Sequence, residues 1–250
     1  MSELFILTGA SRGMGRAMAE QLLRPGVMLL TLERKPAPEL AVLANDAGAH
    51  IVQLAVDLEH GQGAAAGLAA WLHGHGPEAF ARATLINNAG VVGRVGPVDA
   101  ETPESLAAVM RIDLEAPMLL TQAFLAQTAH WKSERRVLNI SSGAGRRAIA
   151  GWAAYCSAKA GLDMFSRTVA LDEARKPNGA KIVSLAPGVI DTGMQVHLRS
   201  ASPEDFPDLA RFIELKNTGA LTSPADAAAR VLAYLAREDF GAEPVADVRN

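Results

Sequence analysis

Three residues in the middle of the chain could together move a proton: Ser142, Tyr155 and Lys159. Tyr155 and Lys159 are four residues apart, about one helical turn, so both side chains would project from the same face of a helix. An ammonium held beside a phenol favours the ionised form and eases loss of the proton. In a pocket, such a phenol can exchange a proton with a substrate oxygen near neutral pH. The same spacing also occurs in surface pairs that are exposed to solvent. The other motifs of the chain are needed to distinguish a catalytic pair from a surface pair.

Short apolar runs alternate with longer amphipathic stretches along the whole chain. The predicted strands are Leu4–Thr8, Val27–Leu32, Ile51–Val56, Ala83–Asn87, Val137–Ser141 and Lys181–Ala186. The predicted helices are Gly13–Arg24, Pro38–Ala47, Gly61–His73, Pro103–His130, Trp152–Arg175 and Pro224–Arg237. Compact apolar runs suit strands buried on both faces, and the alternation predicts an α/β fold with a doubly wound parallel sheet in three layers. No linker or repeat divides the chain, so we expect one domain over residues 1–250.

Composition narrows the class of partner. The chain has 250 residues, 20% of them charged, and a net charge of −3, which argues against a nucleic-acid binder that relies on a basic face. Cys156 is the only cysteine, so an intrachain disulfide is excluded and a reducing compartment is expected. We see no signal peptide and no stretch of membrane-spanning length, and we expect no metal site. These features predict a cytoplasmic protein that acts on a small molecule.

A glycine-rich loop, Thr8–Gly15, follows the first predicted strand and begins the first predicted helix. Its glycines would allow a tight turn and close approach of the backbone to a pyrophosphate. The helix N-terminus would add free N–H groups and a partial positive charge. The spacing is Gly-x-x-x-Gly-x-Gly and differs from the commonest dinucleotide fingerprint. A plain strand–helix turn is the alternative, and the position after the first strand favours a nucleotide site.

Several motifs in one order resemble the short-chain dehydrogenase/reductase family. They are the loop itself, Asn87-Asn88-Ala89-Gly90, the trio of Ser142, Tyr155 and Lys159, Pro187-Gly188 followed by Thr192, and Asp57 near the adenine position. The resemblance covers essentially the whole chain and implies a Rossmann-like fold. It makes Tyr155 the general acid, Lys159 the residue that lowers its pKa and holds the nicotinamide ribose, and Ser142 the residue that bonds the substrate oxygen. The cofactor contacts it implies are Gly9, Ser11, Arg12, Gly13, Met14, Gly15, Glu33, Arg34, Asp57, Asn88, Ala89, Gly90, Tyr155, Lys159, Pro187, Gly188, Val189 and Thr192.

The phosphate state of the cofactor is left open by three residues at the end of the second strand and in the loop. Glu33 would bond the ribose hydroxyls of NAD and repel a 2′-phosphate. Arg12 and Arg34 would suit that phosphate, and in the family basic residues at these positions go with NADP. NADP(H) still fits if Glu33 points outward or pairs with an arginine. We favour NADP(H) over NAD(H).

One position departs from the family pattern. The family usually places an asparagine in the helix after the fourth strand, where it helps to order a water linked to the lysine. Here Arg111-Ile112-Asp113-Leu114 carries Asp113, which accepts hydrogen bonds but donates none when ionised. We expect Asp113 to form a charge pair with Lys159 and to alter the pKa of Tyr155.

The last third of the chain indicates the branch of the family. Residues 186–195 and the stretch from Glu214 resemble sepiapterin reductase and bacterial benzil reductase. This implies reduction of a ketone or vicinal dicarbonyl on an aromatic or pterin ring. We predict that residues 189–219 form a substrate lid. The candidate substrate contacts are Trp152, Met194, Leu198, Phe206 and Asp247, although Asp247 is only a loose match and the alternative is a solvated terminal aspartate.

Two alternatives to a carbonyl reductase follow from the same motifs. One is an NAD-dependent alcohol dehydrogenase of the family. The other is a non-catalytic nucleotide-sensing protein, which would be expected to lose Tyr155 or Lys159, and both are present. Family members usually associate through two long helices, here Pro103–His130 and Trp152–Arg175, so a homodimer or a tetramer is expected by resemblance.

Overall fold

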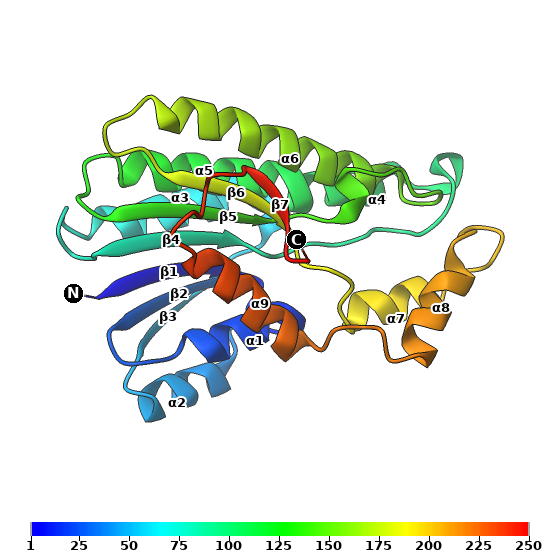
Figure 1. The fold of residues 1–250 in the computed structure, drawn as a ribbon, viewed down its shortest axis with the longest axis horizontal. Coiled ribbons are helices and arrows are strands. Elements are labelled where there is room, and N and C mark those ends of the chain that lie inside the picture. The colour runs from blue at the N-terminus through cyan, green and yellow to red at the C-terminus, as the bar shows by residue number, and fades with distance from the viewer. Residues whose placement is uncertain (1, 250) are drawn as a thin grey trace.

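A seven-stranded sheet forms the centre of the protein in a computed structural model that describes residues 2–249 (Figure 1). Its strands are β1 (Glu3–Thr8), β2 (Val27–Glu33), β3 (His50–Ala55), β4 (Arg82–Asn87), β5 (Glu134–Ile140), β6 (Lys181–Ala186) and β7 (Val245–Asp247). They lie in the order β3-β2-β1-β4-β5-β6-β7, and every neighbouring pair is parallel. The sheet is the expected Rossmann-like one.

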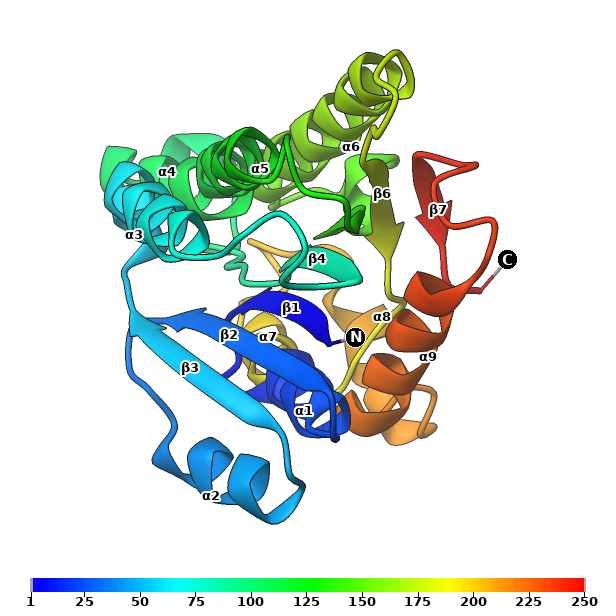
Figure 2. The ribbon, with the colours of Figure 1, turned by 90° about the vertical axis from the view of Figure 1, so that its left-hand side faces the viewer.

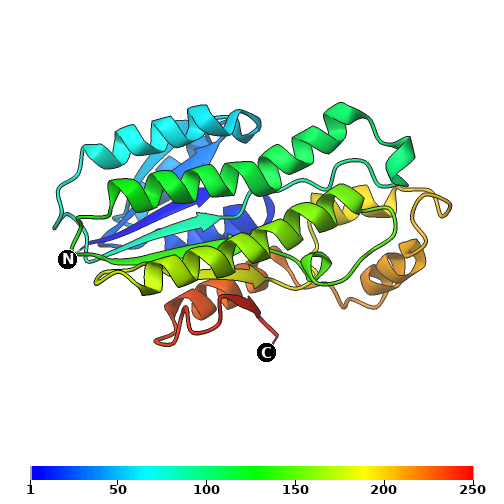
Figure 3. The same cartoon turned by 90° about the horizontal axis from the view of Figure 1, so that it is seen from above.

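Helices cover both faces of the sheet, as Figures 2 and 3 show. One face packs against α1 (Gly13–Leu22), α2 (Pro38–Asp46) and α9 (Pro224–Ala236), and the other against α3 (Gly61–His73), α4 (Pro103–Met110), α5 (Ala116–Gln127) and α6 (Ala153–Ala174). Each face has its own cluster of buried side chains. The three-layer, doubly wound arrangement predicted from the apolar runs is therefore confirmed.

The single helix predicted over Pro103–His130 is wrong. The structure divides it into α4 and α5, joined by a π-helical turn, Arg111–Glu115, in which the Ala116 N–H donates to the carbonyl of Arg111. Pro117 explains the interruption, because proline has no N–H to donate to the carbonyl of Asp113 and its ring crowds that carbonyl. The wider turn places Asp113 inside the protein.

The strand β7 was not predicted. It has three residues, too few for a recognisable run, and it follows Pro244 directly. Its edge position tolerates the proline, whose carbonyl accepts a hydrogen bond from the Ser184 N–H at 2.8 Å. The strand brings Asp247 beside Ala186, where β6 ends.

The segment predicted as a lid contains two short helices, α7 (Gly193–Arg199) and α8 (Leu209–Asn217). Both lie beyond the carboxyl ends of the strands, apart from the helical layers (Figure 1). Two polar contacts join this segment to the loop after β4: His197 Nε2 lies 2.9 Å from the carbonyl of Gly93, and Arg94 pairs with Asp205 at 3.5 Å. The segment therefore covers the edge of the sheet at which the parallel strands end.

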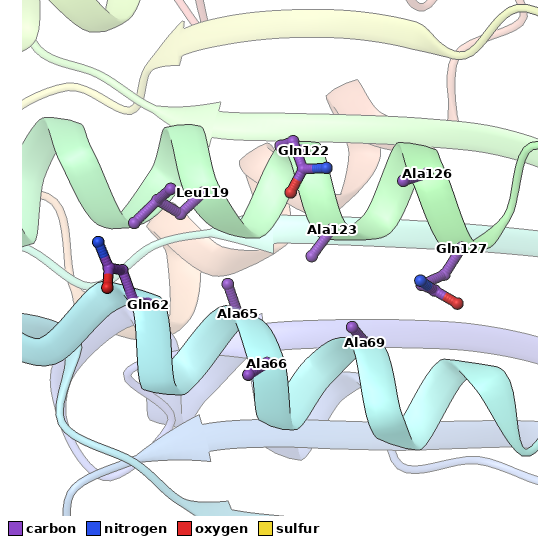
Figure 4. A pocket seen from close by; sticks show the side chains of 9 residues that line it. All are labelled: Gln62, Ala65, Ala66, Ala69, Leu119, Gln122, Ala123, Ala126 and Gln127. Carbon is purple, nitrogen blue, oxygen red and sulfur yellow. The ribbon is translucent and has the colours of Figure 1, made fainter.

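A shallow cavity of ≈ 290 Å³ lies on the outer surface, between α3 and α5 (Figure 4). Alanines such as Ala65, Ala69 and Ala126 line it, with Gln62 and Gln127 at its ends. It reflects the small side chains through which the two helices pack and lies away from the strand ends. Within residues 2–249, the structure contains no helix that combines the length and the hydrophobicity needed to cross a bilayer.

Candidate active site

The glycine loop between β1 and α1 forms an uncapped helix start. Gly9 and Gly13 have φ of 74° and 58°, a region that side chains disfavour. A Cβ atom on Gly15 would overlap the carbonyl of Gly9, so the loop also needs glycine for close packing. No side chain caps α1, and its first turn contains no acidic residue. The N–H groups at this helix start therefore fit the pyrophosphate of a dinucleotide.

Thr8 ties this loop to the Asn-Asn-Ala-Gly motif after β4. Its Oγ1 accepts hydrogen bonds from the N–H groups of Asn88 at 2.9 Å and Ala89 at 3.0 Å, and Asn88 Nδ2 donates to the Thr8 carbonyl at 2.9 Å. The sequence analysis used Thr8 only as part of a motif. Its role as a link could have been inferred from its place at the end of a buried parallel strand, next to the end of β4.

Glu33 neither points outward nor pairs with an arginine. These were the two arrangements of Glu33 that the sequence analysis gave as compatible with NADP(H). Its side chain is 4% exposed and accepts a hydrogen bond from Thr31 Oγ1 at 2.7 Å. Burial raises the pKa of Glu33, while hydrogen bonds from Thr31 and from the backbone of Ala10 act in the opposite direction. Its Oε2 is buried without a hydrogen-bond partner among the described residues.

The other predicted cofactor residues surround the same loop. Arg12 and Arg34 are exposed near Glu33. The Asp57 carboxylate accepts a hydrogen bond from the Glu59 N–H at 3.0 Å and so caps a short helical turn. Thr192, at the start of α7, lies close enough that a Cβ atom on Gly13 would be 3.4 Å from its Cγ2. Thr192 of the Pro-Gly…Thr element and Gly13 of the glycine loop therefore lie next to each other.

The trio of Ser142, Tyr155 and Lys159 comes together where β5 ends and α6 begins. Ser142 follows β5, and both Tyr155 and Lys159 lie in the first turns of α6 with 7% and 4% exposure. The Nζ of Lys159 lies 5.6 Å from the centre of the Tyr155 ring and donates to the carbonyl of Ile140 at 3.1 Å. This buried cluster is not a solvated surface pair.

Tyr155 has a raised pKa. Burial has the largest effect, the charge of Lys159 opposes it, the charge of Asp113 adds to it, and hydrogen bonding by Ser142 lowers it. Burial alone would lower the pKa of Lys159, but the negative charges of Asp113 and Tyr155 outweigh it and raise that pKa. The phenol therefore keeps its proton at neutral pH, and the ammonium beside it keeps its charge.

Asp113 lies against Lys159, as expected from the sequence. Its side chain is fully buried, and Oδ2 lies 3.0 Å from Lys159 Nζ. Its Oδ1 accepts a hydrogen bond from the Val91 N–H at 2.8 Å. Burial raises the pKa of Asp113, and the Lys159 charge acts against this.

An aromatic cluster, defined by Trp152, Tyr155, Phe206 and Phe212, adjoins the phenol. Trp152 meets Tyr155 edge-on at 5.6 Å and stacks on Phe206 at 5.4 Å. Phe212, which the sequence analysis missed, contacts both Trp152 and Phe206. The predicted contacts Met194 and Leu198 pack against the same cluster. The spacing of Leu209 and Phe212 on one face of α8 is the signal that could have pointed to Phe212.

Asp247 differs from both sequence interpretations. It is not solvated, since its side chain is 8% exposed, and its carboxylate accepts hydrogen bonds from Arg249 at 2.6 and 2.8 Å. The hydrogen bonds to Arg249 lower the pKa of Asp247 against the effect of burial. In the structure, the Asp247 carboxylate is therefore paired with Arg249.

Comparison with known proteins gives the family. A family model described as short chain dehydrogenase matches residues 3–203, which include the glycine loop, the Asn-Asn-Ala-Gly motif and the trio. The chain belongs to the short-chain dehydrogenase/reductase family. As a member, it is an NAD(P)-dependent oxidoreductase.

Relatives within the short-chain dehydrogenase/reductase family indicate the branch. The chain is 38% identical to a benzil reductase ((S)-benzoin forming) of Bacillus cereus, over 94% of each chain. It is 33% identical to the sepiapterin reductase of Meriones unguiculatus, over 94% of this chain and 92% of that one. The crystal structure of the KRED1-Pglu enzyme superposes with a TM-score of 0.82 at 26% identity, covering 97% of this chain and 99% of that one. These matches confirm the predicted branch, and they support a carbonyl reductase.

Proposed function

We propose that the protein is an NADP(H)-dependent reductase of ketones or vicinal dicarbonyls, with Tyr155 as the proton donor. The observation that carries this proposal is the position of the Tyr155 phenol. Its ring centre lies 5.6 Å from the Lys159 ammonium, and the ring of Trp152 meets it edge-on at 5.6 Å. A carbonyl held there would have a proton donor on one side and an apolar wall on the other.

Each residue of the trio has a distinct task. Tyr155 donates its proton to the carbonyl oxygen, and the raised pKa means that the proton is present at neutral pH. Ser142 donates a hydrogen bond to the same oxygen as negative charge develops on it. Lys159 holds the phenol and the nicotinamide ribose. The nicotinamide, when bound, supplies the hydride.

The charges of Arg12, Arg34 and Glu33 bear on whether the cofactor carries a 2′-phosphate. Arg12 and Arg34 are exposed at the loop and would neutralise a 2′-phosphate. Glu33 lies between them in sequence, but its carboxylate points toward Thr31 rather than toward solvent. Burial raises its pKa, and the hydrogen bond from Thr31 holds the carboxyl away from solvent. Its unpartnered Oε2 is the observation that favours NAD, because a ribose hydroxyl could donate to it.

The substrate class is argued from the aromatic cluster. Trp152, Phe206 and Phe212 pack ring against ring, and Trp152 meets Tyr155 edge-on. Aromatic rings favour such stacked and edge-on contacts, so a flat aromatic substrate suits this side of the phenol. Two relatives carry the names benzil reductase and sepiapterin reductase, whose named compounds contain rings next to carbonyl groups. We infer a flat aromatic ketone or 1,2-diketone for this chain, with residues 189–219 as the lid over it.

The test is NADPH oxidation with a panel of carbonyl compounds. Benzil, 1-phenyl-1,2-propanedione, isatin and sepiapterin should be reduced, and Tyr155→Phe should lower kcat by about 10²- to 10⁴-fold while cofactor binding persists. Tyr234→Phe is a matched control, since it removes the other tyrosine at a distance from the site and should leave turnover unchanged. If the protein binds NADPH but reduces no member of the panel, the non-catalytic alternative is favoured.

A further inference from the structure

Asp113 owes its position to the break between α4 and α5. The π-helical turn carries it inward until its side chain is fully buried, and Gly90 lets the loop after β4 approach it. A Cβ atom on Gly90 would be 3.0 Å from Asp113 Oδ2. The carboxylate is therefore enclosed between that loop and α6.

The two oxygens of Asp113 face different partners. Oδ1 accepts from the Val91 N–H at 2.8 Å, and Oδ2 faces the Lys159 ammonium at 3.0 Å. A carboxylate can accept at both positions, whereas an amide has one accepting oxygen and one donating nitrogen. An asparagine whose oxygen accepted from Val91 would turn its NH₂ group toward the Lys159 ammonium, so that two hydrogen-bond donors would face each other. The observed contacts to Val91 and Lys159 therefore require an aspartate.

Lys159 has two polar partners within the protein. Its ammonium forms an ion pair with the Asp113 carboxylate at 3.0 Å and donates a hydrogen bond to the Ile140 carbonyl at 3.1 Å. The pair is buried on both sides, with 5% and 0% exposure, so solvent screens it little. The negative charge of Asp113 therefore cancels much of the positive charge that Tyr155 would otherwise feel.

We propose that Asp113 is a positioning residue that neutralises Lys159 and so keeps Tyr155 protonated to more alkaline pH than an asparagine would. This inference rests on the proposed function, because a protonated phenol matters most to a site that donates a proton to a carbonyl. Reduction is present below the pKa of the phenol and is lost as pH rises through it. Asp113 thereby sets the alkaline limit of carbonyl reduction.

Charged groups from several elements act on the pKa of the phenol. Lys159 on α6 lowers the pKa of Tyr155, whereas Asp113 on the π-helical turn and Cys156 on α6 raise it. Asp163 faces Lys159 from one turn along α6, but it is also bonded by Arg146 and Ser184. Ser142, after β5, lowers the pKa of the phenol by hydrogen bonding. Removal of the Asp113 charge leaves Lys159 without its counterion, so the pKa of the phenol falls.

The chain allows a direct measurement, because it contains only two tyrosines. In a Tyr234→Phe background, the near-ultraviolet absorbance of tyrosinate reports Tyr155 alone, without substrate or turnover. We expect Asp113→Asn to lower the midpoint of this titration by about one pH unit. The double variant Asp113→Asn with Lys159→Met lacks both charges and should titrate at or above the wild-type midpoint. A distortion of the site would not be reversed in this way.

A kinetic experiment compares the wild type with Asp113→Asn. With a substrate from the carbonyl panel, the alkaline limb of kcat/KM for Asp113→Asn should move to lower pH by the same shift. An unchanged or raised tyrosinate midpoint in Asp113→Asn, with folding verified by circular dichroism, overturns the proposal even if the protein reduces ketones. If no carbonyl is reduced, the proposed function fails, while the titration still decides whether Asp113 controls the phenol.

Discussion

At the scale of single residues, the choice of cofactor depends on a few charges at the end of β2 and in the glycine loop. If Arg12 and Arg34 hold a 2′-phosphate, each makes a charge-assisted hydrogen bond that NADH cannot use. We expect Arg34→Ala to lower kcat/KM for NADPH about 10- to 100-fold and to leave the value for NADH nearly unchanged. Initial rates with both cofactors measure the ratio.

Glu33→Gln is the matched comparison at the same strand end. It removes the charge but retains the shape and the hydrogen bond to Thr31. If the buried Glu33 carboxyl does not repel the 2′-phosphate, kcat/KM for NADPH should change little in Glu33→Gln. A wild-type preference for NADH, or a gain for NADPH of more than about tenfold in Glu33→Gln, would show that Glu33 is an ionised ribose ligand instead and would contradict the NADP(H) proposal.

Residue spacing explains why the clustering of Ser142, Tyr155 and Lys159 could be predicted, whereas the state of Glu33 could not. Tyr155 and Lys159 are one helical turn apart, and Ser142 follows a strand whose apolar run ends at the active edge, so local geometry is sufficient. The direction of the Glu33 side chain depends on Thr31 and on the backbone of Ala10, a contact between β2 and the loop after β1. No local pattern reports such a contact.

At the scale of elements, aromatic packing joins residues 189–219 to the start of α6. Phe206 lies between α7 and α8, is fully buried, and stacks on Trp152 at the start of α6. Phe206→Ala should remove the stacked ring and leave a cavity, at a cost of about 3 kcal/mol. We expect KM for an aromatic diketone to rise about tenfold or more, because Trp152 loses the ring that stacks on it, while the Kd for NADPH stays the same. Steady-state kinetics and fluorescence titration of NADPH separate the two.

Phe206→Leu is the control for that experiment, because it keeps most of the apolar volume and removes only the aromatic ring. An intermediate KM would assign the remainder to ring stacking. If Phe206→Ala instead weakens cofactor binding and leaves KM for the ketone unchanged, residues 189–219 would not act as a substrate lid.

The same scale shows where sequence patterns fail. Six strands were predicted because buried parallel strands are continuous apolar runs, and β7 was missed because it consists of three residues after a proline. The helix over Pro103–His130 was predicted as continuous because its apolar periodicity persists through the π-helical turn. Pro117 was the available signal, and it is the residue whose missing N–H accompanies the inward turn of Asp113.

At the scale of the whole molecule, the outer surface of α5 and α6 is the candidate for self-association. Met164 and Leu171 lie two turns apart on one face of α6 with 58% and 71% exposure, and Met118 on α5 is 39% exposed. The two helices lie side by side on the same side of the sheet (Figure 3). We propose that this surface joins two copies of the chain, as expected from the family resemblance. Burying these side chains on association would remove their contact with water.

Leu171→Glu tests the dimer directly. A charge at the centre of an apolar interface would be desolvated without a partner, so we expect the variant to elute and sediment as a monomer while the wild type does so as a dimer or tetramer. In a monomer the same change alters the free energy of unfolding by no more than about 0.5 kcal/mol, since the side chain is exposed. Val42→Glu is the matched control: Val42 is 61% exposed on α2, on the opposite face of the sheet, and its substitution should leave the mass unchanged. A wild-type monomer, or an association that survives Leu171→Glu and is broken by Val42→Glu, would place the contact elsewhere.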